Sequence, residues 1–407
     1  MNPTPDSSKR KLQRVDEPAS RVGRLPAVLD YGFRPMFLAA AGWAMIALAL
    51  WLAMFAGYVQ LPTRFNPLAW HAHEMLFGFV MAAVAGFLLT AIPNWTSRPP
   101  MRGHRLAALA VLWLLGRLAC LVSAELPAWL AVTADLSFPV CLLAFATREI
   151  TASRNWRNLP VTIPLVLFIV SDVLMHLESA GISASTGLGW RLAVGAPILM
   201  ISFIGGRIIP AFTRNWLSKR NSSRLPSAHN FIDTAALGVL AAALTLWAFL
   251  PGHHLSGAPL LVAALLQALR LARWAGLATW PEPLLFILHV GYGWVAAGTA
   301  LLGLSSFDTG VPAAAAIHAL TAGAIAVMIL AVMPRVTLGH TGRALTANRS
   351  TVVVFTLINA AAIARVCASW HPESMIVLLM VAGACWIAAF GLFEIVYGPM
   401  LLRRRSE

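Results

Sequence analysis

Several histidines of this chain stand in stretches that are otherwise apolar. His71 and His73 lie two residues apart in the run WHAHEM, directly before Glu74 and Met75. Three more lie in or beside other apolar stretches: His289, His318 and His340. A polar ring in apolar surroundings costs free energy unless it is hydrogen-bonded or bound to a metal. Because neutral imidazole is a common ligand of haem iron and copper, these histidines are candidate ligands.

Helix geometry decides which of these neighbours could act together. His71 and His73 are separated by about 200° around a helix, so they cannot hold one ion unless the helix is unwound. His71, Glu74 and Met75 share a face, and imidazole, carboxylate and thioether together suit copper or an axial haem position. The predicted metal ligands are therefore His71, His73, Glu74, Met75, His318 and His340. An interfacial histidine pair with hydrogen-bonded core histidines elsewhere is the alternative reading.

The depths of the histidines predict two separate sites. At about 1.5 Å per residue, His318 lies about 10 Å inside the outer end of its helix, and His71 lies near the outer end of another. Small residues around His318 permit close helix contact, so we expect the two helices to pack and bring His318 towards His71 or His73. His289 lies about 8 Å from the cytoplasmic end of its helix and belongs to a separate inner site. Haem or another cofactor is accordingly predicted to contact His71, His73, His289, His318 and Arg207.

Other ionisable residues have simpler interpretations. Arg117 and Asp135 stand at similar depths in a tight hairpin and predict a structural ion pair. Asp172 and His176 are four residues apart, which predicts a local hydrogen bond. Arg207 stands near the cytoplasmic boundary, where it could extend to water or neutralise a haem propionate.

Two further groups are expected to be inert. The pair His253-His254 follows Pro251-Gly252 and is expected to be a solvated loop. The four cysteines form no CxxC pair and lie in apolar segments, so we predict that they are small packing residues: Cys120, Cys141, Cys367 and Cys385.

The composition requires membrane helices to hold these residues. Hydrophobic types make up 59% of the 407 residues, charged types 11%, and the mean hydropathy is +0.74. A helix crosses the hydrocarbon with about 20 residues, so there is room for about twelve spans. We expect an all-α polytopic bundle with spans at 35–57, 69–93, 105–123, 127–146, 159–177, 188–212, 230–250, 257–275, 284–304, 311–334, 350–369 and 374–397. Residues 1–34 and 398–407 are then basic cytoplasmic tails around a membrane domain at 35–397.

The basic residues predict the orientation. Of the 30 Lys and Arg residues, only Arg64 and Arg191 fall in one set of alternate loops, and three lie within spans: Arg117, Arg207 and Arg365. The rest lie in the opposite set, which predicts cytoplasmic termini by the positive-inside rule. This distribution explains the net charge of +14 without nucleic acid. The expected environment is a lipid bilayer.

A short pattern recurs every four spans. The motif P-x-x-T stands at the cytoplasmic ends of spans 2, 6 and 10, at Pro93–Thr96, Pro210–Thr213 and Pro334–Thr337. It indicates three units of four helices, unless the recurrence is due to chance.

Long stretches of this sequence resemble the NnrS family of haem- and copper-containing membrane proteins. The similar stretches are FRPMFL (33–38), WHAHEMLFGF (70–79), GFLLTAIPNWT (86–96), GGRIIPAFTRNWL (205–217), LHVGYGW (288–294) and HALTAGAIAVMILAVMPRVTLGHTGR (318–343). Met36 and Ser97 depart from the family pattern, where Phe and Gly are expected, and neither is a candidate ligand.

The resemblance implies a multi-pass protein of the bacterial inner membrane that carries haem and copper. It also implies a role in denitrification and the nitric oxide response, relieving nitrosative stress. A distant likeness to the catalytic subunit of haem-copper oxidases would place ligands on spans 2, 6 and 10 and a His pair after span 7. Span 6 here has no histidine, however, and span 10 has only His318 within it.

Three functional hypotheses follow from the sequence. The first is a haem/copper protein that binds or converts nitric oxide or another small ligand, with the electron donor and the enzymatic status undetermined. The second is a twelve-span permease without a redox cofactor, favoured by Pro139, Pro197, Asp135 and Asp172 within spans. The third is a sensor or assembly factor without turnover.

Overall fold

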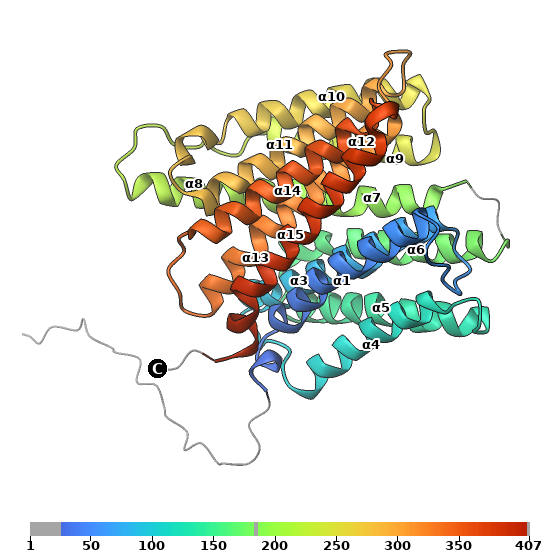
Figure 1. The fold of residues 1–407 in the computed structure, drawn as a ribbon. Helices are drawn as coiled ribbons and strands as arrows, with labels where there is room; N and C mark the ends of the chain where they lie inside the picture. The colour runs from blue at the N-terminus through green and yellow to red at the C-terminus, as the bar shows by residue number, and fades with distance from the viewer. Residues whose placement is uncertain (1–25, 183–185, 405–407) are drawn as a thin grey trace, which may run out of the picture.

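The protein is a single bundle of membrane helices. The computed structural model describes residues 26–182 and 186–404, and the regular elements in these ranges are all helical (Figure 1). Twelve of the helices are long and apolar enough to cross a membrane, which confirms the predicted fold class. Many apolar side chains on the outside of the bundle are exposed, among them Val111, Leu265 and Ile376. Such a surface suits lipid rather than water.

The spans fall into three consecutive groups of four. Spans 1–4 are α1 (Phe33–Phe55), the continuous α2–η2–α3 (Pro67–His73, Glu74–Val80, Met81–Thr96), α4 (His104–Leu121) and α5 (Ala128–Ala152). Spans 5–8 are η3–α6 (Trp156–Val161, Thr162–Ser179), α7–η4–α8 (Leu188–Met200, Ile201–Gly205, Gly206–Ser218), α9 (Phe231–Phe249) and α10 (His254–Ala272). Spans 9–12 are α11 (Pro283–Leu304), α12–η6–α13 (Ala313–His318, Ala319–Ala326, Val327–His340), α14 (Arg349–Cys367) and η7–α15 (Pro372–Ser374, Met375–Leu402). Two short 3₁₀ turns complete the list, η1 (Ala27–Leu29) and η5 (Gly276–Thr279).

The predicted span boundaries differ from the observed ones mainly at helix ends near polar residues. The spans predicted to end at 146, 212 and 334 continue to Ala152, Ser218 and His340. Hydropathy marks only the part of a helix that lies in hydrocarbon, whereas backbone hydrogen bonding carries the helix on into polar surroundings.

Spans 2, 6 and 10 form the centre of the bundle. In their most apolar stretches 83%, 67% and 67% of the residues are buried within the protein, against 33–56% in the other nine spans. They contact one another through η2 with α7, α7 with η6, and α3 with α13. The other helices pack around this centre in three consecutive sets, α4–α5–α6, α9–α10–α11 and α14–α15–α1.

Each central helix contains a π-helical segment, namely η2, η4 and η6. These are also the helices that carry P-x-x-T, and their prolines lie inside α3, α8 and α13 rather than at the helix ends. A π-helical segment interrupts the regular order of helix faces, and such segments are frequent at functional sites. The recurrence in the sequence therefore marks the three central helices of three four-span units.

The two described ends of the chain lie together. The guanidinium of Arg34 donates to the carbonyls of Met400, Leu401 and Arg403, at 2.9–3.1 Å. Arg404 donates to the carboxylate of Asp30 at 2.7 Å. Both ends are therefore on one side of the membrane, and their cytoplasmic position stays a prediction. The opposite end of the bundle is called the distal end below.

The predicted tails are described only in part. Residues 1–25 and 405–407 lie outside the described residues. The helix α15 continues through residues 398–402, which the sequence had suggested to be tail.

Candidate metal centre and ligand cavity

Span 2 presents its two histidines to different places, as helix geometry predicts. His71 is half-buried and faces a cavity, whereas His73 is fully buried among charged side chains. Ala72 alone separates them. The distal end of span 2 thus joins two sites of different character, the ligand cavity and the charged cluster.

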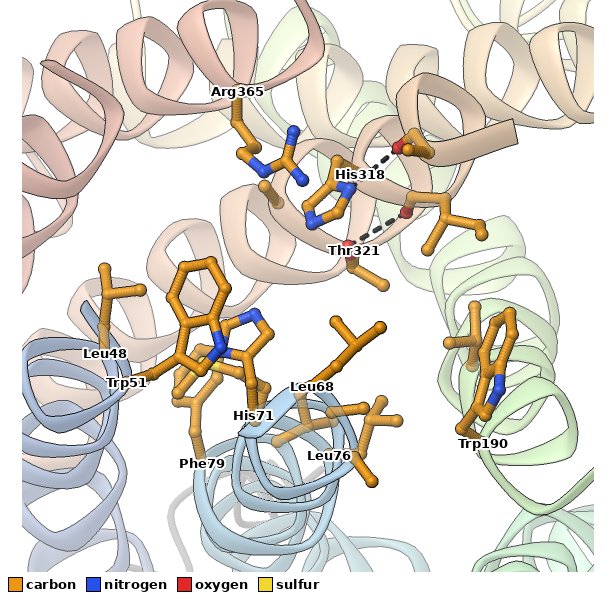
Figure 2. Close-up of a pocket in the computed structure, with 18 of the residues that line it drawn as sticks. Leu48, Trp51, Leu68, His71, Leu76, Phe79, Trp190, His318, Thr321 and Arg365 are labelled. Carbon is orange, nitrogen blue, oxygen red and sulfur yellow. Dashed lines mark hydrogen bonds between the residues drawn. The ribbon is translucent and has the colours of Figure 1, made fainter. Parts of the chain in front are cut away.

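The ligand cavity lies between span 2 and span 10. Its volume is about 640 Å³, within the range of sites for drug-sized ligands and cofactors. His71 and His318 both line it, and Figure 2 shows their rings pointing towards each other across it. Most other lining side chains are apolar, including Leu48, Leu76 and Phe79. The expectation that His318 approaches His71 therefore agrees with the structure.

The surroundings of His71 and His318 leave each imidazole with a ring nitrogen that could bind a metal. His318 Nδ1 lies 2.7 Å from the carbonyl oxygen of Ala314. A neutral His318 must donate its proton there, so Nε2 keeps its lone pair for the cavity. His71 stacks on Trp51 at a centroid distance of 4.2 Å. Within the described part of the chain, its buried Nδ1 has no hydrogen-bond partner.

Arg365 is the cation inside this cavity. It comes from the distal end of α14 and lies beside His318 in Figure 2. Its Nη1 donates to Ser369 Oγ at 3.2 Å, which leaves its other nitrogens available. Arg64 also lines the cavity, but it donates to the carbonyls of Ser123 and Leu126 at 2.9 and 2.8 Å. A carboxylate-bearing ligand would therefore find its partner at Arg365.

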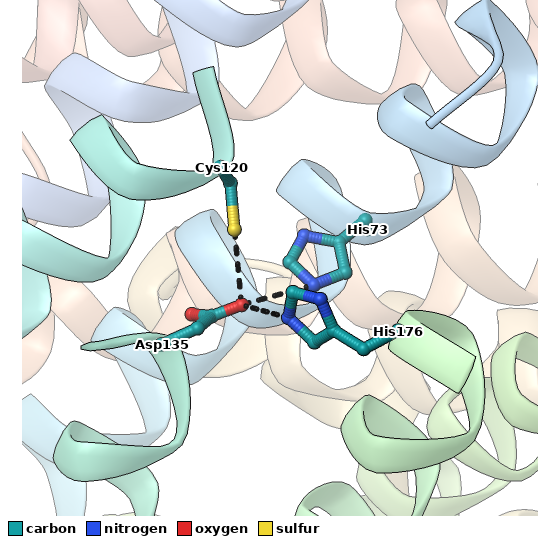
Figure 3. A group of neighbouring side chains, drawn as sticks. All are labelled: His73, Cys120, Asp135 and His176. Atoms are coloured by element: carbon teal, nitrogen blue, oxygen red, sulfur yellow. Dashed lines mark hydrogen bonds and ion pairs between the residues drawn. The ribbon is translucent and has the colours of Figure 1, made fainter. Parts of the chain in front are cut away.

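The charged cluster joins spans 2–5 on the other side of span 2. Its potential metal ligands are His73, Cys120, Asp135 and His176, which are all buried (Figure 3). One ligand atom from each lies within 4.8 Å of the others. Four separate helices supply them, α2, α4, α5 and α6, so the cluster exists only in the folded bundle.

The carboxylate of Asp135 is the centre of the cluster. Its Oδ2 lies 3.1 Å from Nε2 of His73, Nε2 of His176 and Sγ of Cys120. Asp172 adds its Oδ1, at 3.0 Å from His73 Nε2 and 3.5 Å from His176 Nε2. Both imidazoles therefore face the same two carboxylates.

Arg117 and Glu74 form the outer part of the cluster. Arg117 donates to Glu74 at 2.9 and 3.0 Å and pairs with Asp135. Glu74 also accepts from Trp43 Nε1 at 2.8 Å and contacts His73 Nδ1 at 3.0 Å. The predicted ion pair Arg117–Asp135 is confirmed, as part of one network rather than as an isolated contact. His176 lies 3.5 Å from Asp172, but its hydrogen bond is to Asp135 rather than the predicted local one.

The charges of this cluster do not balance without a further cation. Three buried carboxylates, Glu74, Asp135 and Asp172, face one guanidinium, Arg117. Within the described residues, Asp172 Oδ2 has no hydrogen-bond partner. Buried charges need compensation in a low-dielectric region. Two protonated imidazoles or one divalent cation between the histidines would supply it.

The spacing of the ligand atoms suits a metal ion. Four ligands at about 2.1 Å around a tetrahedral ion are about 3.4 Å from one another. The contacts of the two Nε2 atoms with Asp135 and Asp172 span 3.0–3.5 Å. Imidazole and thiolate together are typical of zinc and copper sites.

Of the two residues predicted to share a face with His71, Met75 does so and Glu74 does not. Met75 lines the cavity with His71, but Glu74 turns to Trp43 and Arg117. The π-helical segment η2 begins at Glu74, so the regular 3.6-residue order of faces ends there.

The remaining predicted ligands lie away from both sites. His289 Nε2 contacts Thr213 Oγ1 at 2.9 Å, as in the alternative reading of a hydrogen-bonded core histidine, and a cofactor site there stays a prediction. His340 is exposed and packs near Phe33, at a ring distance of 5.8 Å. Arg207 is half-buried, lies over the ring of Phe203 and does not line the cavity. His253 is exposed and caps the start of α10.

Sequence reasoning missed three members of the charged cluster as metal ligands. Cys120 was interpreted as a packing residue, and Asp135 and His176 as parts of local pairs. The available signal was their common depth: each lies near the distal end of its span. Depth alone does not show which sides of four helices face one another.

The fold and the sites define a polytopic helical membrane protein with a buried group of metal-ligand side chains. The profile of one family, described as NnrS protein, matches residues 27–405, nearly the whole chain. The protein therefore belongs to the NnrS family, and the family together with the cluster fits a metal-binding membrane protein. No curated protein matches the sequence.

Proposed function

We propose that this protein is a haem- and copper-binding protein of the bacterial inner membrane that acts in the response to nitric oxide. In this proposal haem occupies the ligand cavity and copper occupies the charged cluster. The termini are on the cytoplasmic side, as the distribution of Lys and Arg suggests. Family membership and the two sites support the proposal.

The observation that carries the proposal is the pair of imidazoles facing one cavity from two central helices. Imidazole is a common ligand of haem iron, and His71 and His318, which face each other across the cavity, would hold the haem. The Ala314 carbonyl fixes the ring of His318, and stacking on Trp51 fixes that of His71. Arg365 would neutralise a propionate. Bound haem would supply an iron centre for electron transfer or for binding a small gas.

The charged cluster would hold copper through the two histidines, Cys120 and Asp135. These side chains come from four helices, and Arg117 and Glu74 connect three of them, α2, α4 and α5. Cys120, whose thiol now donates to Asp135, would hold the ion as a thiolate. The role of the remaining side chains is to orient the ligands and to balance charge.

The first experiment is an absorption spectrum and a pyridine haemochrome assay of the purified protein. We expect a Soret band with haem bound, and loss of most of that haem in His71→Ala and His318→Ala. His253→Ala is the matched control because its imidazole is exposed at a helix start. Full haem content in both cavity variants would remove these residues as ligands. Loss in His253→Ala would point to a site at the distal loop instead.

A second experiment tests the connection with nitric oxide. The spectrum of the haem-loaded protein should shift on addition of nitric oxide, and cells lacking the protein should grow more slowly under nitrosative stress. Consumption of nitric oxide by the purified protein would distinguish turnover from sensing. An unchanged spectrum and unchanged growth would contradict the role in this response.

A permease is the alternative. Pro139 and Pro197 do lie inside α5 and α7, as transport helices often require. Asp135 and Asp172, however, are engaged with histidines in the charged cluster. A purified protein without a Soret band and without bound copper would favour the permease.

A further inference from the structure

A second cavity lies on the axis of the bundle, between the three central helices. Its volume is about 90 Å³, and span 1 contributes Phe37 to its wall. The lining residues are apolar throughout, among them Ala83, Ile204 and Met328. All three π-helical segments border it directly, through Val80 in η2, Ile201 in η4 and Ile325 in η6.

This axial cavity adjoins the ligand cavity. Val80 and Ile325 line both, one from span 2 and the other from span 10. One layer of side chains therefore separates the proposed haem position from a small apolar space. The two residues belong to the same π-helical segments that follow His71 and His318 along their helices.

The chemistry of the lining decides what can occupy the space. A buried water needs two to four polar partners, and a purely apolar lining offers none. Apolar cavities of this kind stay dry and take up apolar molecules such as xenon. A water molecule has a share of liquid volume of about 30 Å³, so a space of 90 Å³ admits a diatomic molecule with room to move.

We propose that the axial cavity is a binding site for an uncharged diatomic gas, held one side-chain layer from the ligand cavity. It deepens the proposed function, since it rests on haem in the ligand cavity as the acceptor of that gas. The gas would be held in the dry axial cavity. It would reach the ligand cavity by passing between Val80 and Ile325. Charged or strongly hydrated small molecules would be excluded by the apolar lining.

The direct test uses xenon as an apolar probe and does not need haem. Ala83→Leu places a larger side chain in the axial cavity, because Ala83 is part of its wall. Ala242→Leu is the matched control, because Ala242 is exposed on α9. Xenon NMR of the full chain in lipid nanodiscs should show bound xenon in the wild type and the control and less in Ala83→Leu. Equal xenon binding in all three would overturn the proposal.

A kinetic test addresses the path to haem. In haem-loaded protein, rebinding of carbon monoxide after a light flash should be several-fold slower in Ala83→Leu than in the wild type. Ile325→Ala should bind more xenon and rebind carbon monoxide several-fold faster, because it widens the passage. Ile325→Ala therefore also tests the proposal if Ala83→Leu does not fold. Unchanged xenon and unchanged rebinding in Ile325→Ala would overturn the proposal.

The two proposals fail in different ways. Suppose that the Soret band is missing but Ala83→Leu still binds less xenon than the wild type. This result would contradict the haem assignment and support the gas site, with its acceptor unidentified. A normal Soret band with no xenon difference would contradict the gas site alone.

Discussion

The ligand cavity and the charged cluster differ in what surrounds the same residue type. His71 and His73 stand two residues apart on α2, yet one faces about 640 Å³ of apolar space and the other is packed among three carboxylates. The cavity offers apolar space and two imidazoles that face it, His71 and His318. The cluster offers charge and four potential metal ligands close together. What a buried histidine can bind is therefore decided by the helices that pack against it, more than by its own helix.

Removing Arg117, the guanidinium of the charged cluster, should have the largest effect on the stability of the protein. Arg117→Ala leaves Glu74 and Asp135 buried without their guanidinium, which typically costs about 3–5 kcal/mol. We expect much lower membrane yield and a lower unfolding temperature, measured by fluorescence-detected gel filtration after heating. Arg403→Ala is the control, since its side chain is exposed. Equal yields for the two variants would contradict the importance of the cluster for folding.

Ligand variants should separate the two sites. His176→Ala should lose most of the bound copper and keep haem, whereas His318→Ala should lose haem and keep copper. The reason is that no side chain of the cluster lines the ligand cavity. Elemental analysis and the haemochrome assay on the same samples measure both. Parallel loss of haem and copper in each variant would mean that the sites form a single unit.

A milder change tests the charge balance of the cluster. Asp172→Asn removes one of three carboxylates but keeps the shape of the side chain, and Asp172 contacts both histidines. We expect metal affinity to fall about 10–100-fold, as for other residues that orient metal ligands. Titration with a competing chelator measures it, with Asp308→Asn at an exposed position as control. Tighter metal binding in Asp172→Asn would show that protonated histidines balance the charge instead.

The smallest effect is expected at the cation of the cavity. Arg365→Gln should weaken haem binding about fivefold, since one partly exposed charge pair contributes about 1 kcal/mol. Arg207→Gln should leave haem affinity unchanged, because Arg207 lies outside the cavity. Haem titration of the apoprotein compares them. A larger loss in Arg207→Gln would restore the sequence-based assignment of Arg207 to a propionate.

The sequence predicts the local features of this protein well. Hydropathy gives twelve spans, and helix periodicity correctly separates His71 from His73. Common depth predicts the pair Arg117–Asp135 and the approach of His318 to His71. The separation of His71 from His73 and the pair Arg117–Asp135 depend on distances along one helix or across one hairpin, where the chain itself fixes the geometry. The approach of His318 to His71 was predicted from equal depth and from the small residues around His318.

The features that the sequence did not predict depend on packing between distant spans. Cys120 and His176 meet only because α4 and α6 turn particular sides towards α2 and α5. Glu74 turns away from the cavity to Trp43 on α1 and Arg117 on α4, and Arg365 faces the cavity because α14 packs on span 10. Hydropathy does not determine how a helix is rotated about its own axis. The sequence therefore does not show which sides of these helices face one another.

The contact between the two chain ends makes the bundle almost a closed circle. Asp30 and Arg404 are already paired, and α1 already packs on α15, so a short linker between residues 404 and 26, the two described ends, could join them without moving a helix. Opening the chain instead within residues 219–230, between α8 and α9, would give a circular permutant that begins with span 7. Every helix would keep its direction across the membrane, because an even number of spans lies on each side of the cut. The order in which the spans are synthesised could thus be changed while both sites keep all their residues.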